Sequence, residues 1–230
     1  MIDVDAATLA SHIDQTLLNP TIGFTEAGEW IEDNRQLGFA TLCVSPFLAP
    51  MAAQRLFDST TRVCSVVAFP FGYASTLAKA DEGARLVELG CLEVDMVVNF
   101  AALLEGEDGF VGHDIEAVVK SVARASGGTA IVKVILETGY LQPSDIERGC
   151  ALAVRGGADF VKTSTGFGPR GASIDDVRIM RAAVGPDIGV KAAGGIRDLA
   201  SALAMLDAGA DRIGTSAGGA ILAEASGEKA

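Results

Sequence analysis

Eight short runs of apolar and β-branched residues recur along the chain, and stretches with helical spacing separate them. The runs are the expected strands, over residues 13–18, 40–45, 63–69, 93–99, 131–137, 160–164, 189–193 and 211–216. The clearest expected helices cover residues 25–37, 76–89 and 144–154, the last with a capping pattern of Ser144 and Glu147. Alternation of this kind is typical of βαβ units, and eight units favour a closed barrel over a doubly wound sheet. We therefore expect an α/β fold, a single (β/α)₈ TIM-barrel domain over residues 1–230.

Composition restricts the partners of such a barrel. The 230 residues are 49% hydrophobic and 21% charged, with a formal net charge of −12. This acidity argues against nucleic acid, and the absence of a long apolar run or a signal-like start argues against a membrane or export. The four cysteines form no CxxC motif, as expected of reduced thiols, so we expect a cytoplasmic protein. An anionic substrate would need a local cationic patch.

Two near-copies, GADFVKTSTG and GADRIGTSAG, allow the repeats to be aligned on the glycine that ends each preceding helix. The alignment places four residues at equivalent positions of even-numbered strands: Cys43, Asp95, Lys162 and Gly214. Alternate strands of a barrel contribute side chains to the same interior layer, so these four should face one another. A buried structural ion pair is the simplest alternative interpretation of Asp95 and Lys162.

Three lysines stand in apolar strand contexts: Lys133, Lys162 and Lys191. If all three point inward, crowded positive charge and desolvation should lower the lysine pKa, which makes an amine able to form a Schiff base with a carbonyl. The register puts Lys162 in the layer of Asp95 and Lys191 in an adjacent layer. Each lysine alone could instead extend its amine to solvent from a strand end. The two histidines form no ligand-spaced pair, so we expect no metal and no cofactor.

Small residues follow the last three expected strands, in the segments STGFGPRG, AAGGIR and GTSAGG. Barrels often bind phosphate at the loops after strands seven and eight, where Gly194, Gly195, Ser216 and Gly218 lie. Glycine also serves any tight turn, so two such loops side by side are only moderately specific. The pattern indicates a phosphate site at this end of the barrel.

With these residues in place, the chain resembles the deoxyribose-phosphate aldolase family over nearly its full length. The matching segments are IDQTLLNP, TLCVSP, VVAFPFG, EVDMVVN, KVILETG, FVKTSTGFGPRGA, VKAAGGIR and RIGTSAG. The resemblance implies a Schiff-base aldolase on a (β/α)₈ barrel, a carbon–carbon lyase of deoxyribose phosphate degradation. Such an enzyme interconverts 2-deoxy-D-ribose 5-phosphate with acetaldehyde and D-glyceraldehyde 3-phosphate, and a homodimer is one assembly to expect.

The resemblance also implies roles for individual residues. Lys162 is then the Schiff-base lysine, and Lys191 and Asp95 are its proton donor and acceptor partners. Substrate or phosphate binding falls to eight residues: Asp14, Thr16, Lys133, Thr165, Gly166, Gly194, Gly195 and Ser216. Arg170 and Arg197 are further basic neighbours of the expected phosphate.

The sequence departs from the family pattern at three places. Gln15 stands where the family often has histidine, Ala217 replaces a second serine, and the tail from residue 221 contains no tyrosine. Two other functions stay open. Another Schiff-base aldolase or transaldolase would use Lys162 and Asp95 equally well, and a non-catalytic sugar-phosphate binding barrel would need only the glycine loops.

Overall fold

The computed structural model describes residues 5–227 and contains a closed eight-stranded barrel. All strands are parallel and pair in chain order, and β1 pairs with β8 to close the ring. The strands are β1 Ile13–Leu17, β2 Thr41–Val44, β3 Arg62–Val67, β4 Glu93–Val97, β5 Ile131–Ile135, β6 Phe160–Lys162, β7 Gly189–Ala193 and β8 Arg212–Thr215. The (β/α)₈ prediction is confirmed, and the doubly wound alternative is excluded.

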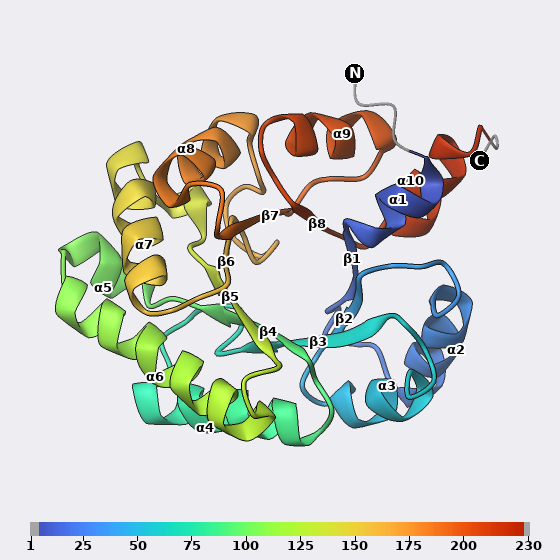
Figure 1. Ribbon diagram of the computed structural model, residues 1–230, viewed down its shortest axis with the longest axis horizontal. Helices are drawn as coiled ribbons and strands as arrows, with labels where there is room; N and C mark the ends of the chain where they lie inside the picture. Colours follow the sequence, from blue (N-terminus) through green and yellow to red (C-terminus); the bar gives the residue numbers. More distant parts are fainter. Residues whose placement is uncertain (1–4, 228–230) are drawn as a thin grey trace.

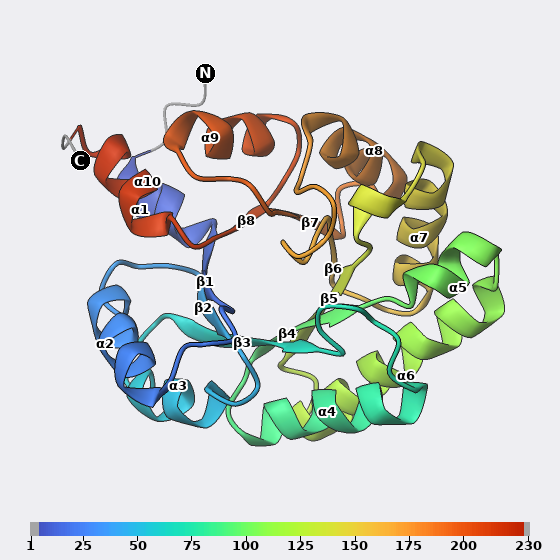
Figure 2. The same cartoon turned by 180° about the vertical axis from the view of Figure 1, so that it is seen from behind.

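Helices surround the strands on the outside of the ring (Figures 1 and 2). They are α1 Ala6–Ser11, α2 Phe24–Asn34, α3 Ala49–Arg55, α4 Thr76–Glu88, α5 Phe100–Glu105, α6 Asp108–Ser126, α7 Pro143–Arg155, α8 Ile174–Val184, α9 Leu199–Asp207 and α10 Gly218–Ala225, with a 3₁₀ turn over Thr138–Tyr140. The first and last helices, α1 and α10, lie side by side in both views. No helix among the described residues is long and apolar enough to cross a membrane.

The capping pattern expected at Ser144 is wrong. Helix α7 begins two residues earlier, because Pro143 occupies its first turn and needs no N–H partner there. The backbone N–H of Gln142 donates to the Asp145 carboxylate at 3.2 Å. Gln142 is therefore the residue that precedes the helix.

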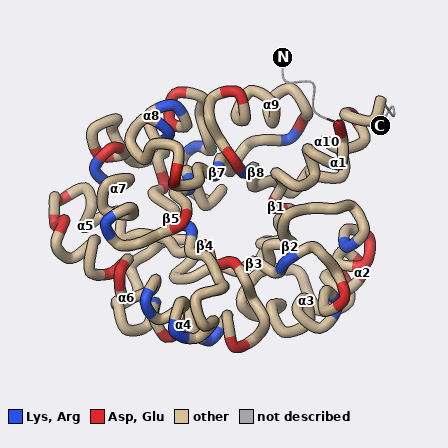
Figure 3. The backbone as a smooth tube through the Cα atoms, viewed as in Figure 1, with Lys and Arg blue, Asp and Glu red and all other residues tan. Residues whose placement is uncertain are grey.

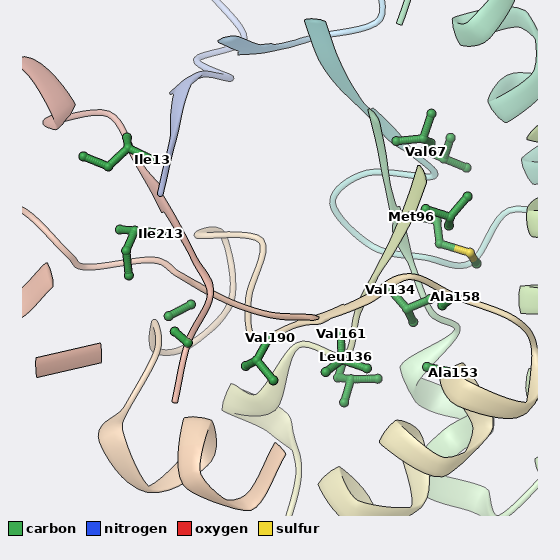
Figure 4. Close-up of a cluster of buried hydrophobic side chains, with 14 of the residues drawn as sticks. Ile13, Val67, Met96, Val134, Leu136, Ala153, Ala158, Val161, Val190 and Ile213 are labelled. Carbon is green, nitrogen blue, oxygen red and sulfur yellow. The ribbon is translucent and has the colours of Figure 1, made fainter. Parts of the chain in front are cut away.

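The apolar core lies between the strands and the helices. Side chains that alternate along each strand point outward into it, among them Val134, Val161, Val190 and Ile213 (Figure 4). Their neighbours Lys133, Lys162, Lys191 and Arg212 take the opposite face, which is the barrel interior. Because side chains alternate along each strand, apolar residues face the helices and charged residues face the barrel interior.

Most charged residues lie on the outer helices, and a smaller set lies on the strands (Figure 3). One buried pair, Lys79 with Asp114, joins α4 to α6 at 2.5 Å. Lys79 also donates to the carbonyl of Val97 at the end of β4. This pair sits outside the barrel, so it fixes helices without taking part in the interior charge network.

Candidate active site

A pocket of about 310 Å³ opens at the carboxyl ends of the strands, where barrels carry their binding sites. Its walls come from the ends of β1, β6, β7 and β8 and the loops after them. Of the residues predicted for the site, it is lined by Thr16, Lys162, Thr165, Gly166, Gly194, Gly195 and Ser216. The structure therefore brings the expected lysine and the expected phosphate loops to one cavity.

Lys162 is the lysine that reaches this pocket. Its side chain is 4% exposed, whereas those of Lys133 and Lys191 are 0% exposed, and neither lines the pocket. Its amine donates to Oδ2 of Asp95 at 2.7 Å, the one carboxylate within ion-pair distance of it among the described residues. A carbonyl compound entering the pocket would meet this amine first.

Asp95 lies beneath Lys162 and contacts three lysines. Its Oδ2 accepts from both Lys162 and Lys191 at 2.7 Å, and its Oδ1 accepts from Lys133 at 2.8 Å. Burial alone would raise the pKa of the Asp95 carboxyl, but the three ammonium groups outweigh it and hold the pKa well below its usual range. Asp95 is therefore an anion that bridges Lys162 and Lys191 through one oxygen.

Further charges balance the interior below Asp95. Lys191 lies 2.5 Å from Oδ2 of Asp14, and Lys133 lies 2.6 Å from Glu93. Arg212 lies 2.6 Å from Asp14 and 3.4 Å from Glu93. The interior network thus holds four cationic side chains, counting Lys162, against three carboxylates. One positive charge is in excess when all seven groups are ionised. Arg62, which is half-exposed and lies 3.8 Å from Glu93, is not included in this balance.

The expected lowering of lysine pKa values by crowding is wrong for Lys133 and Lys191. Burial would lower both pKa values, but Asp95 and Asp14 raise them above the ordinary lysine value, with Glu93 adding to the effect at Lys133. The sequence reasoning counted the lysines without their carboxylate partners. The expected separation into two layers also fails at the amines, because Lys162 and Lys191 are register partners that share one oxygen of Asp95.

The glycine-containing loops that line the pocket offer hydrogen-bond donors. Within the described chain, the backbone N–H groups of Gly166, Gly194, Gly195 and Ser216 donate to no protein acceptor. Gly194 has φ +90°, and its carbonyl lies where a Cβ on Gly171 would stand, so the two loops approach closely. With a left-handed backbone at Gly194, successive N–H groups form a concave surface that suits an anion.

The two arginines expected near the phosphate behave differently. Arg197 is exposed and lines the pocket, which supplies positive charge at its mouth. Arg170 instead pairs with Asp176 and donates to the carbonyl of Thr138 at 3.0 Å, and it does not line the pocket. Arg170 therefore holds the loop after β5 and does not contact the pocket.

Cys43 and Cys64 face Asp95 across the interior, which confirms the layer expected for Cys43. Their sulfur atoms and a carboxylate oxygen of Asp95 all lie within 4.8 Å of one another, a grouping that the sequence analysis missed because it did not place Cys64. The amine of Lys133 stands 3.5 Å from Sγ of Cys64 and 2.8 Å from Asp95. This ammonium therefore contacts two of the three groups in the cluster.

Comparison with known proteins decides the family. The family model described as "DeoC/LacD family aldolase" matches residues 40–224, which is most of the chain. The chain belongs to the DeoC/LacD aldolase family. This aldolase is 46% identical to a deoxyribose-phosphate aldolase of Carboxydothermus hydrogenoformans, over 95% of the chain and 96% of the relative. It is 48% identical to deoxyribose-phosphate aldolase 1 of Bacillus licheniformis, over 93% and 94%.

Solved structures agree with the sequence relatives. The deoxyribose phosphate aldolase of Aeropyrum pernix, described as having a unique tetrameric structure, superposes on this aldolase with a TM-score of 0.86. The two are 32% identical, and the match covers 95% of this chain and 91% of that one. The resemblance inferred from sequence motifs is confirmed.

The departures from the family pattern have local explanations. Gln15 is buried, donates to Asn34 of α2 at 3.0 Å and accepts from the backbone N–H of Gly218 at 3.0 Å. It therefore ties α2 to the start of α10 in this aldolase. Ala217 uses its backbone N–H to bond Thr215, so that group is not free for a ligand. The last three residues of the tail, 228–230, lie outside the described residues.

Sequence reasoning missed three site residues of this aldolase. Glu93 and Arg212 belong to the interior network, and Glu137 bonds the loop after β6. The inward period of two along the strands could have placed Glu93 and Arg212, since they precede Asp95 and Gly214 by two residues. Glu137 ends the expected strand over residues 131–137, but β5 stops at Ile135, so the strand period does not indicate the bond from Glu137 to the next loop.

We expect Asp14→Asn to lower the free energy of unfolding at pH 7 by about 3–5 kcal/mol, because three buried cations lose a carboxylate partner. Lys191, Lys133 and Arg212 hold the pKa of Asp14 below its usual range. The stability that the carboxylate contributes is thus fully present above about pH 4 and lost as pH falls through the folded-state pKa. Urea unfolding across this range measures the difference.

The matched control is Asp58→Asn, which removes an exposed carboxylate 2.5 Å from Arg35 and should cost about 1 kcal/mol or less. A cost for Asp14→Asn no greater than the control, or one that stays constant on acidification well below pH 4, would contradict the account.

Proposed function

We propose that this chain reversibly cleaves 2-deoxy-D-ribose 5-phosphate to acetaldehyde and D-glyceraldehyde 3-phosphate through a Schiff base on Lys162. One observation carries the proposal above the others. A lysine amine lines the same pocket as four residues whose backbone N–H groups have no protein acceptor among the described residues. An aldehyde at one end of a substrate and a phosphate at the other would match these two features. The names of the sequence relatives support the same substrate.

The choice of Lys162 rests on access and charge. A nucleophilic amine must be neutral, and the interior network carries one excess positive charge when every group is ionised. Lys133 and Lys191 each contact two or more carboxylates, which raise their pKa values and keep them charged. Lys162 has a single carboxylate contact and lines the pocket, so it is the lysine whose amine can turn to a substrate with the fewest ion pairs broken.

Asp95 and Lys191 supply a path for protons. Oδ2 of Asp95 accepts from both amines, so a proton can pass between Lys162 and Lys191 through one carboxylate. Formation of the imine from the amine and the aldehyde requires a proton for the departing water. The paired Lys191 ammonium can replenish that proton without contact with bulk water.

The bond changes follow from the imine chemistry. The Lys162 amine adds to C1 of the substrate and water leaves, which gives a protonated imine. Loss of the C3 hydroxyl proton then breaks the C2–C3 bond, and the bonding electrons move onto the imine to form an enamine. D-Glyceraldehyde 3-phosphate leaves at this point. Protonation of the enamine at C2 and addition of water release acetaldehyde and restore the amine.

The phosphate end of the substrate meets the loops after β6, β7 and β8. We assign its contacts to the N–H groups of Gly166, Gly194, Gly195 and Ser216, with Arg197 nearby. Thr16 and Thr165 line the pocket between the two ends. Asp14 and Lys133 lie below the pocket in the charge network, so we assign them to holding the lysines in place. We also propose that the enzyme acts in the cytoplasm, with a homodimer as one assembly.

Purified protein should cleave 2-deoxy-D-ribose 5-phosphate without an added metal ion, because the lysine provides the electron sink that a metal would otherwise supply. Acetaldehyde release, followed by its reduction with NADH and alcohol dehydrogenase, measures the rate. Dialysis of the protein against a chelator should leave this rate unchanged.

Other aldol phosphates of matched charge serve as the control substrates. A higher kcat/KM on one of them would assign the chain to another Schiff-base aldolase, and no turnover on any would favour a non-catalytic binding barrel. A rate that is lost on dialysis and restored by zinc would contradict the lysine mechanism.

We expect Asp95→Asn to fold and to lose about 10²–10⁴-fold in kcat, the usual contribution of a general acid–base group. The amide keeps the shape of the carboxylate but cannot carry the proton between the two lysines. Circular dichroism measures the folding of the variant, and steady-state kinetics measures its kcat. A folded variant with a kcat within threefold of the parent would make Asp95 a structural residue.

A further inference from the structure

Glu137 is a buried carboxylate just after β5 that the mechanism above does not use. Its side chain is on the catalytic face, and the residue is 1% exposed. Its backbone has φ +57°, one of two left-handed conformations found at non-glycine residues in the described chain. Such a conformation costs about 1–3 kcal/mol and persists where the surrounding contacts demand it.

The contacts of Glu137 run directly to the loop after β6. Its Oε2 accepts from both the backbone N–H and the hydroxyl of Thr165, with the first distance 3.2 Å. The Thr165 hydroxyl in turn accepts from the backbone N–H of Phe167 at 3.0 Å. Two N–H groups of the loop are thereby fixed through one carboxylate and one hydroxyl.

Gly166 lies between those two fixed groups. It has φ +88°, and its own N–H donates to no acceptor in the described chain. Because Thr165 and Phe167 are tied on either side, the Gly166 N–H has a defined direction at the wall of the pocket. A loop whose donor is fixed before the ligand arrives loses less entropy on binding than a mobile one.

The fit around Glu137 is close. A Cβ on Gly168 would stand 2.8 Å from the Glu137 carboxyl carbon and from Oε1. Oε1 is buried and has no hydrogen-bond partner among the described residues. The chain thus folds the β6 loop tightly over this carboxyl group and leaves one of its oxygens unpaired.

We infer that Glu137 is a positioning residue that orients the Gly166 N–H through Thr165 and so makes the enzyme prefer a phosphorylated substrate over the same sugar without phosphate. The inference rests on the proposed function. It adds a residue outside the pocket that determines which substrate class is favoured.

The acceptor role of Glu137 does not require a negative charge. Burial raises the pKa of the Glu137 carboxyl, although bonds from Thr165 and the charges of Lys162 and Arg170 act in the opposite direction. An amide oxygen can accept from the backbone N–H and the hydroxyl of Thr165 as Oε2 does. Glutamine reproduces this acceptor without charge, so it is the conservative replacement.

The test compares kcat and KM on 2-deoxyribose 5-phosphate and on unphosphorylated 2-deoxyribose. Glu137→Ala should raise KM for the phosphorylated sugar about tenfold or more, the loss typical of a bond to a charged group, and change kcat little. Its kcat/KM for the unphosphorylated sugar should stay within about threefold of the parent. Glu137→Gln should restore the parent's preference.

Glu82→Ala is the matched control. Glu82 is half-buried and accepts the backbone N–H of Ala68, the other left-handed non-glycine residue, at 2.8 Å. It holds the loop after β3, whose Phe69 ring packs edge-on against Phe167 of the β6 loop. The control therefore disturbs a neighbouring loop while the bonds between Glu137 and Thr165 stay in place, and the ratio of the two kcat/KM values should stay unchanged. Thr165→Val removes the hydroxyl from the other side and should also raise KM for the phosphorylated sugar and weaken phosphate binding, which keeps the test open even if Glu137→Ala folds poorly.

Equal losses on both substrates in Glu137→Ala, or no loss on the phosphorylated sugar in Glu137→Ala and in Thr165→Val, would overturn the inference. Line broadening of inorganic phosphate in ³¹P NMR gives a readout that needs no turnover, and it should weaken in the same two variants. If the parent cleaves neither sugar, the proposed function fails, and the phosphate titration alone then decides the role of Glu137.

Discussion

Three ammonium groups share the Asp95 carboxylate inside the barrel, at 2.7–2.8 Å and almost without solvent. A buried charge is tolerated only where partners compensate it, so each lysine requires a carboxylate and each carboxylate requires a lysine. Asp14, Glu93 and Arg212 extend this compensation toward the other end of the strands. The network fixes Lys133 and Lys191 as charged groups and leaves Lys162, at the pocket, as the lysine with the fewest constraints.

The fold was predictable because the strand signal is local. Each of the eight strands shows its own apolar run, and alignment on the helix-ending glycines placed Cys43, Asp95 and Lys162 in one layer correctly. The raised pKa of Lys191 was not predictable in this way, because it depends first on Asp14, which β1 brings to β7 across more than 170 residues of chain. Ion pairs of this kind form only after the barrel closes. The strand period indicates which face a side chain occupies, but not its distance from charged groups on other strands.

The glycine-rich loops at the pocket were predictable from the sequence, whereas the residue that supports one of them was not. Glycine-rich segments after β6, β7 and β8 marked the phosphate wall, since small residues and left-handed turns are needed where backbone N–H groups point at an anion. The support behind that wall was hidden. Glu137 stands at the end of the expected strand over residues 131–137, and nothing in the sequence indicates that its carboxyl group bonds Thr165 of the next loop.

The central claim is that Lys162 is the nucleophile, and reductive trapping tests it most directly. Protein incubated with limiting acetaldehyde and sodium borohydride should carry a two-carbon adduct on Lys162, located by peptide mass spectrometry. Lys120 on the exposed face of α6 provides the reference for non-specific alkylation. The account predicts labelling of Lys162 far above that of Lys120 and none on Lys133 or Lys191. An adduct on Lys191 in place of Lys162, or labelling of Lys162 no greater than that of Lys120, would contradict it.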